Sequence, residues 1–288
     1  MRLSVLTPVR LWARNILNKF IFGVTFTFYF GREVAYLFFI QAMISFFRRI
    51  YLYYCLGVFS IFFFIFFPLL LIPVLFKSQY KLVGVFNRWW AKVVFTFCFL
   101  PFSVECRGRL NPDHQYIFCP NHFSYIDIPT MGLNPHNAIF VGKHDMEKIP
   151  LFGFMYRHLH ITVDRNKLMS RYSTYKKSIQ AIEEGKSLVI FPEGGMVAKE
   201  FPRMGRFKDG AFKLSIHKQI PIVPVTIATN WILLPDGSSE LKWYPIRVVF
   251  HEPISPEQKS EEELKEVVFK IMDTELKKEE KKYRNANR

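Results

Sequence analysis

The feature that most constrains the fold is an uncharged stretch of 27 residues, Ile50–Phe76. It contains the run Ile61–Phe67, which is made only of isoleucine and phenylalanine. Because an α-helix needs about 20 apolar residues to cross a bilayer, the stretch is long enough for one span. Arg48 and Arg49 border it on one side and Lys77 on the other. The stretch therefore predicts a membrane-spanning helix, and its length and distance from the N-terminus argue against a secretory signal peptide.

The segments before this stretch are also apolar, but each is short for a span. Phe20–Phe30 and Val34–Phe47 are separated by Gly31–Glu33. Together they are compatible with a hairpin, with a second span that contains an ion pair, or with helices lying in one leaflet. Pro68 and Pro73 are expected to kink or end the long helix. A buried helical hairpin of a soluble protein is the alternative, and the number and orientation of spans stay open.

The positive charge of the chain follows its apolar residues. The formal net charge is +15; residues 1–110 hold 13 Lys/Arg and 2 Asp/Glu, whereas residues 111–288 hold 26 and 22. Cations that flank long apolar runs favour anionic lipid headgroups, whereas a nucleic-acid binder presents them on a polar face. We therefore expect a membrane bilayer as a partner and no nucleic acid. The four cysteines form no C-x-x-C pair, so their spacing predicts neither a metal site nor a disulfide framework.

After Pro101 short apolar runs alternate with helical patterns. The runs predict strands at Ser103–Cys106, Tyr116–Cys119, Ala138–Val141, Ile161–Val163, Leu188–Phe191, Val223–Ile227 and Ile246–Phe250. Helices are expected at Ile126–Gly132, Pro150–His158, Leu168–Glu184 and Gly210–Lys218. Continuous apolar runs are typical of strands buried on both faces. We therefore predict an α/β fold, with a mixed, largely parallel sheet covered by helices.

The C-terminal segment predicts one more helix. Ser260 and Glu263 have the spacing of a capping box, and apolar residues follow at helical spacing. The last residues, Lys277–Arg288, are charged and expected to fray. The sequence thus suggests a membrane-anchoring helical region (1–100), an α/β domain (101–256) and a charged C-terminal helix and tail (257–288).

One histidine and one aspartate follow the second predicted strand closely. His122 and Asp127 are five residues apart, which brings their side chains across one turn if a helix starts near Ser124. An imidazole that donates one N–H to a carboxylate can accept a proton at its other nitrogen near pH 7. The chain has no G-x-S-x-G element, so the pair favours activation of a hydroxyl group on the substrate. The alternative is that His122 only packs and Asp127 only starts a helix.

Other predicted strand ends carry groups suited to an anion. Lys143 and Arg165 follow the third and fourth strands, Gly194 and Gly195 follow the fifth, and Lys208 comes shortly after. Ligands of open α/β sheets gather beyond the carboxyl ends of the strands. An arginine offers a planar fork for phosphate, and consecutive glycines let backbone N–H groups approach an anion. These residues predict an anion pocket beside the histidine.

Five blocks in this order resemble the glycerolipid acyltransferase family, whose type activity is that of 1-acyl-sn-glycerol-3-phosphate (lysophosphatidic acid) acyltransferase. The blocks are Asn121–Asp127 (NHFSYID), Lys143–Gly153 followed by Val163–Arg165, Phe191–Gly195 (FPEGG), Phe207–Gly210 (FKDG) and Ile222–Val225 (IVPV). The resemblance covers roughly Pro101–Pro253. It implies the glycerolipid acyltransferase fold, and it implies N-terminal helices that dock on the membrane, with an active site on the cytoplasmic side.

The resemblance also implies roles for the matching residues. His122 would take the proton of the acceptor hydroxyl, Asp127 would orient it, and the hydroxyl would attack the thioester of acyl-CoA or acyl-carrier protein. Lysophosphatidic acid would be the acceptor, and neither a metal nor a bound cofactor is implied. The expected substrate-binding residues are Lys143, Arg165, Glu193, Gly194, Gly195 and Lys208 around the acceptor and Pro224 on the acyl side.

Gly195 departs from the family pattern, which usually has Ser or Thr there. A missing hydroxyl donor leaves other acceptors open: another lysophospholipid, glycerol 3-phosphate or an acylated amino-acid lipid. A non-catalytic, membrane-bound lipid-binding protein is the alternative from another class. For Glu193, which would repel a phosphate, the alternative role is an ion pair with a nearby lysine.

Overall fold

The computed structural model describes residues 6–164 and 167–286, and its centre is a seven-stranded sheet in the order β1-β7-β6-β2-β5-β3-β4. Neighbouring strands are parallel except β6 and β7, which are antiparallel. The strands are β1 (Phe102–Cys106), β2 (Ile117–Pro120), β3 (Ala138–Lys143), β4 (Ile161–Val163), β5 (Ser187–Ile190), β6 (Ile222–Ile227) and β7 (Ile246–Phe250). All seven predicted strands and the mixed, largely parallel sheet are confirmed.

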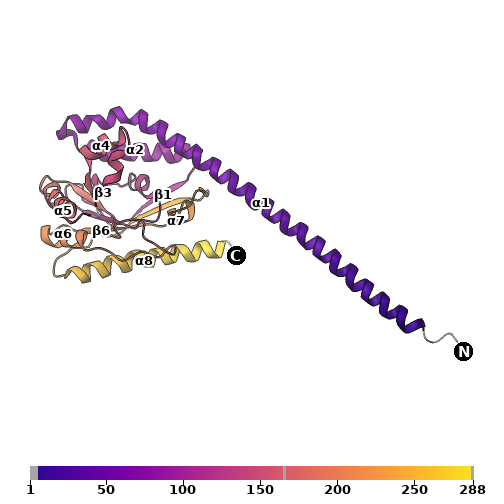
Figure 1. Cartoon of the computed structure of the whole chain (residues 1–288). Coiled ribbons are helices and arrows are strands. Elements are labelled where there is room, and N and C mark those ends of the chain that lie inside the picture. Colours follow the sequence, from indigo (N-terminus) through magenta and orange to yellow (C-terminus); the bar gives the residue numbers. More distant parts are fainter. Residues whose placement is uncertain (1–5, 165–166, 287–288) are drawn as a thin grey trace. The chain divides into compact units, whose positions relative to one another are not determined.

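Helices cover both faces of this sheet (Figure 1). They are α2 (Leu82–Phe97), α3 (Asp127–Met131), α4 (Phe152–Leu159), α5 (Leu168–Glu183), α6 (Gly210–Lys218), α7 (Asn230–Leu233) and α8 (Glu261–Ala286), with short 3-10 turns η1 (Lys77–Gln79) and η2 (His144–Lys148). Figure 1 shows α8 along one face and α2 and α4 over the other. Burial between two helical layers explains why the central strands, such as β2 and β6, are continuous apolar runs.

The core is divided by the alternation of side chains along each strand. Ile117 and Cys119 of β2 belong to a cluster with residues of α5, α6 and α8. Phe118, which lies between them in the sequence, belongs to a second cluster on the opposite face with Met131 of α3. This two-residue period is the one that a strand imposes.

The strands β2, β5 and β3 are parallel, so their carboxyl ends lie at one edge of the sheet, and the predicted site residues follow these ends.

The chain divides into two compact units, Met1–Tyr51 and Leu52–Arg288. The helix α1 (Leu6–Leu75) begins in the first unit and ends in the second, and Gly31–Glu33 lies inside it rather than in a turn. The second unit starts upstream of the boundary expected near residue 100, and the three-part functional division stays a prediction. Pro68 and Pro73 lie inside α1, which ends two residues after Pro73.

One segment of α1, Val34–Leu75, is long and apolar enough to cross a membrane by length and composition, and its most apolar window is only 17% buried. A helix in the core of a soluble protein would be mostly buried. Within the second unit, Phe63 and Leu70 pack against Val83 of α2 and against Met155 and Leu159 of α4. The part of α1 in this unit therefore packs on the globular domain with one side only.

The C-terminal helix begins as predicted and ends later than predicted. The backbone and hydroxyl of Ser260 both donate to the Glu263 carboxylate, 2.7 and 2.8 Å away, which confirms the capping box. The expectation that Lys277 onward frays is wrong for the described residues, because α8 continues to Ala286. Glu279 and Glu280 of this segment form ion pairs with Arg247 and Arg203. These tertiary contacts hold a segment whose own sequence is almost entirely polar.

Candidate active site

A histidine, His122, follows the carboxyl end of β2 by two residues. The Asn121 side chain donates to the Ile227 carbonyl at 3.1 Å and accepts the Ile227 N–H at 2.8 Å, so it continues the pairing of β2 with β6 beyond the last strand residue. Its neighbour His122 turns away from the sheet, with 12% of its side chain exposed. The imidazole stacks on the ring of Phe191, with ring centres 4.2 Å apart. The ring is thereby fixed between the ends of β2 and β5.

Asp127, the first residue of α3, accepts hydrogen bonds from four N–H groups and is fully buried. Its Oδ2 lies 2.9 Å from His122 Nδ1, 2.7 Å from the Phe123 nitrogen and 2.8 Å from the Ser124 nitrogen. Its Oδ1 accepts an N–H from Asn230 at 3.0 Å. Because two backbone N–H groups also donate to Oδ2, that oxygen is an acceptor, and the imidazole donates to it from Nδ1. The lone pair of Nε2 is then available to accept a proton.

A second buried carboxylate, Glu193, joins two loops through their backbones. Its Oε1 accepts the His122 N–H at 2.9 Å and its Oε2 accepts the Gly205 N–H at 2.7 Å. Only 1% of the residue is exposed. Burial raises the pKa of the Glu193 carboxyl to about 7, although both backbone hydrogen bonds lower it. Glu193 therefore braces the histidine turn against the loop that leads to α6, and its partners are backbone groups rather than a lysine.

The turn after β5 requires glycine at position 194. Its φ is +76°, a conformation that other residues adopt at a cost. A Cβ atom there would also lie 2.8 Å from Cε and 3.0 Å from Nζ of Lys208. The backbone nitrogen of Lys208 donates to the Pro192 carbonyl at 2.8 Å. The end of the Lys208 side chain therefore packs against Gly194, in the space that a Cβ atom would fill.

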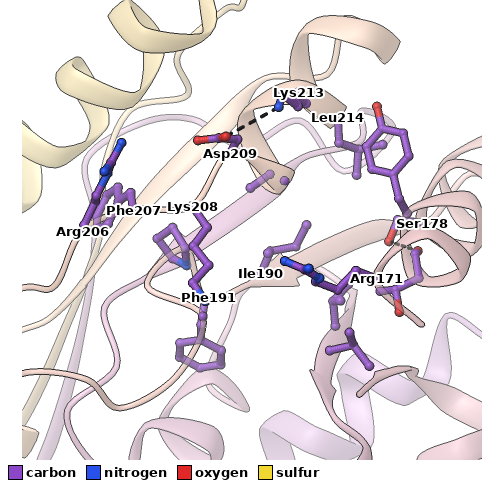
Figure 2. A pocket seen from close by; sticks show the side chains of 18 residues that line it. Arg171, Ser178, Ile190, Phe191, Arg206, Phe207, Lys208, Asp209, Lys213 and Leu214 are labelled. Atoms are coloured by element: carbon purple, nitrogen blue, oxygen red, sulfur yellow. Dashed lines mark hydrogen bonds and ion pairs between the residues drawn. The ribbon is translucent and has the colours of Figure 1, made fainter. Parts of the chain in front are cut away.

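Lys208 and Gly194 line a cavity of about 620 Å³ between the ends of β3, β4 and β5 and helices α5 and α6. Figure 2 shows the guanidinium end of Arg171 turned toward Lys208, with Lys213 turned to Asp209. Neither Arg171 nor Lys208 has a carboxylate partner among the residues that the structure describes. Phe191, which stacks on the imidazole, is also part of the lining. The cavity is therefore an anion-attracting space next to the histidine.

A family model for acyltransferases matches residues 103–228, which include the dyad, the glutamate and the cavity lysine. The chain carries an acyltransferase domain. The match agrees with the acyltransferase resemblance that the order of the motifs predicted for this region.

The acyltransferase domain has curated relatives named 1-acyl-sn-glycerol-3-phosphate acyltransferase. The chloroplastic protein of Brassica napus is 27% identical over 175 residues, which are 59% of this chain and 50% of the relative. The Saccharomyces cerevisiae protein is 29% identical over 161 residues, 55% of this chain and 53% of the relative. The chain thus spans about half the length of these relatives.

The fold is similar to the crystal structure of the 1-acyl-sn-glycerophosphate acyltransferase PlsC from Thermotoga maritima, with a TM-score of 0.67 at 21% identity. The alignment covers 83% of this chain and 97% of that protein, which confirms the fold.

The acyltransferase domain does not gather all the predicted binding residues in the cavity. Gly195 follows Gly194 in the same turn, but Lys143 pairs with Asp145 and is absent from the cavity lining. Pro224 lies inside β6, beside Cys119 of β2, and is buried in the sheet. Arg165 lies outside the described residues.

Two residues that contact the dyad or line the cavity were missed by the sequence analysis. Asn230 reaches Asp127 from α7, about a hundred positions away, and Arg171 lines the cavity from the first turns of α5. Asn230 follows the last block, and no short motif marks it. A search for cations facing the sheet from α5 would have found Arg171, because its position one turn before the buried Thr174 puts it on the inner side of that helix.

Proposed function

We propose that this protein transfers a fatty acyl group from an acyl thioester to the free hydroxyl of 1-acyl-sn-glycerol-3-phosphate, giving phosphatidic acid. The observation that carries the proposal is the imidazole of His122 beside a cation-lined cavity; Asp127 holds its Nδ1, and no described residue bonds its Nε2. The names of the relatives support the same acceptor.

His122 acts as the general base in this proposal. Its Nε2 takes the proton of the acceptor hydroxyl as the oxygen attacks the thioester carbonyl, and a tetrahedral intermediate forms. Asp127, buried and ionised, stabilises the imidazolium. The intermediate collapses, the carbon–sulfur bond breaks, and the imidazolium returns the proton to the leaving thiolate. The products are the ester and the free thiol, and His122 is restored without an acyl-enzyme.

The phosphate of the acceptor lies between Lys208 and Arg171 in this proposal. Both cations line the cavity without an acidic partner among the described residues, so a dianion would supply the missing charge. Arg165 is proposed as a third contact. Glu193 acts through its two backbone partners, which avoids placing a carboxylate against phosphate. Lys143, Gly194, Gly195 and Pro224 stay proposals as substrate contacts.

The acyl donor is acyl-CoA or acyl-carrier protein, and the protein works at a membrane. Both the acceptor and the product carry acyl chains and reside in bilayers. The segment Val34–Leu75 is suited to anchoring the enzyme there. We place the active site on the cytoplasmic side, where soluble thioesters are available.

A donor and acceptor panel tests the proposal. Full-length protein purified in detergent is incubated with palmitoyl-CoA or palmitoyl-carrier protein and with lysophosphatidic acid, glycerol 3-phosphate or a zwitterionic lysophospholipid. Thiol release and the acylated product are measured together. We expect phosphatidic acid with one of the donors and loss of at least ~100-fold in His122→Ala. His114→Ala, at an exposed loop histidine, is the control. Thiol release without phosphatidic acid, or full activity in His122→Ala, would overturn the proposal.

A further inference from the structure

Asn230 is a buried polar residue with an unpaired amide atom. It is fully buried, and its Nδ2 donates to Asp127 Oδ1 at 3.0 Å and to Thr130 Oγ1 at 2.9 Å. Its Oδ1 has no hydrogen-bond partner among the described residues. An unpaired buried oxygen costs free energy. The two hydrogen bonds that the amide nitrogen of Asn230 donates explain why an asparagine occupies this position despite that cost.

The orientation of the amide follows from its neighbours. The hydroxyl of Thr130 donates to the Ile126 carbonyl at 2.8 Å, so the Thr130 oxygen is left to accept. If the Asn230 amide were turned over, its oxygen would face two groups without a free proton, the Asp127 carboxylate and the Thr130 oxygen. The amide nitrogen must therefore face Asp127.

A neutral amide has a property here that other donors lack. Its one nitrogen carries two hydrogens and can donate to both Asp127 Oδ1 and Thr130 Oγ1, whereas a hydroxyl has only one hydrogen to donate. A lysine could also donate twice, but its charge would offset that of Asp127 and make the imidazole a weaker base. The amide holds the carboxylate in place and offsets its negative charge less than a lysine would.

We propose that Asn230 is a positioning residue for the reaction proposed above: it holds the Asp127 carboxylate so that Oδ2 faces Nδ1 of His122, and it limits the charge that the imidazole meets. The claim rests on the proposed function for its kinetic consequences only. Its electrostatic consequence, the titration of His122, can be observed without turnover.

Asn230→Ala should change the rate and its pH dependence together. Without the N–H on Oδ1, more negative charge faces the imidazole, so His122 should hold its proton to a higher pH. The acid limb of the kcat profile then moves upward in pH, and kcat falls roughly 10- to 100-fold, as for groups that orient a working residue. The KM values should change little, because Asn230 is not part of the cavity lining. Asn230→Ser, which keeps one donor, should be intermediate.

Asn134→Ala is a matched control. Asn134 is also a buried asparagine with an unpaired amide atom, here Nδ2, and its Oδ1 accepts the His136 N–H. It bonds neither member of the dyad. This variant should lose stability as Asn230→Ala does but keep the wild-type acid limb.

The deciding measurement is the NMR titration of ring-labelled histidines in the full-length protein, with His122 assigned from His122→Gln. Among the described residues, Glu193 is the other titratable group next to the dyad, and burial raises its pKa to about 7. Every variant in this experiment retains Glu193. A higher titration midpoint of His122 in Asn230→Ala, or in Asn230→Ser if the alanine variant does not fold, supports the inference. Equal midpoints in wild type and both variants overturn it. Absence of acyl transfer by the wild type would overturn the proposed function, and the titration would still decide the role of Asn230.

Discussion

At the residue scale, the site has two buried carboxylates with different surroundings. Asp127 accepts four N–H groups, including that of the imidazole. Glu193 accepts two backbone N–H groups, and burial outweighs them, so its pKa lies near 7. The sequence predicted the pairing of His122 with Asp127 from their spacing together with the motifs at the other strand ends. It could not predict the donor from Asn230 or the backbone role of Glu193, because these join segments that are separated in the chain.

The raised pKa of Glu193 predicts a pH-dependent contribution to stability. A carboxyl whose folded-state pKa exceeds its unfolded value of 4.5 stabilises the fold fully below pH 4.5, and the contribution is lost as the pH rises through about 7. The unfolding free energy of wild type minus that of Glu193→Gln should therefore fall between pH 5 and pH 8. The change should be on the order of 3 kcal/mol at most, since one pKa unit corresponds to about 1.4 kcal/mol.

Denaturant unfolding in detergent at both pH values measures this difference. Glu257→Gln, at an exposed glutamate, is the control and should track wild type. A constant difference between wild type and Glu193→Gln would contradict the raised pKa. The amide variant should also loosen one loop at every pH, because its NH₂ group would face either the His122 or the Gly205 N–H.

At the element scale, α5 brings Arg171 to the cavity and the loop before α6 brings Lys208, and neither cation has a carboxylate partner among the described residues. Arg171→Gln and Lys208→Gln should each raise the KM for lysophosphatidic acid by ~10- to 100-fold, because a hydrogen bond to a charged group contributes about 1.5–3 kcal/mol. The KM for the thioester should stay within about twofold. Lys177→Gln, on the exposed side of α5, is the control. Equal effects on both KM values would mean that the cavity does not distinguish acceptor from donor.

The helix α8 is held to the sheet by ion pairs that can be removed one at a time. Glu275 is 4% exposed, and its oxygens lie 2.8 Å from nitrogens of Arg247 and Arg107. Glu275→Ala should lower the unfolding free energy by about 2–4 kcal/mol, because it leaves both arginines without a shared buried partner. Thermal unfolding measures the loss, and Glu266→Ala, on the exposed side of α8, should change it by less than about 0.5 kcal/mol. A similar loss in both variants would mean that these ion pairs do not hold the helix.

The same helix shows where prediction from sequence succeeds and fails. All seven strands were predictable within two residues; β2, β3, β5 and β6 are almost entirely buried, continuous apolar runs, whereas β1 and β7 interrupt such runs with Ser, Glu or Arg. The start of α8 was predictable from its capping box. Its last turns were not, because Glu279 and Glu280 depend on Arg247 and Arg203, which only the folded chain brings near. Likewise, α7 is four residues long and has no periodicity to detect.

At the scale of the whole molecule, the chain joins a basic, apolar N-terminal region to a nearly charge-balanced α/β domain. The proposed function gives this arrangement a purpose, because the proposed acceptor and product both carry acyl chains and reside in a bilayer. Anionic lipids attract the cations that flank the apolar stretch, and the effect weakens with salt. The whole-molecule question is therefore whether the apolar stretch enters a bilayer.

A charge in the middle of this stretch provides the test. Phe64 is 58% exposed, so replacing it removes little packing from the folded protein. Phe64→Lys should lower the fraction that resists alkaline carbonate extraction several-fold, because a lysine at the centre of a span costs about 2.5–3.5 kcal/mol on insertion. Phe64→Leu should behave as wild type, and Glu266→Lys, which adds a charge on the exposed side of α8, should too. Equal retention of all these proteins would mean that the stretch does not enter the bilayer, and complete extraction of wild type would mean that the protein binds membranes only at their surface.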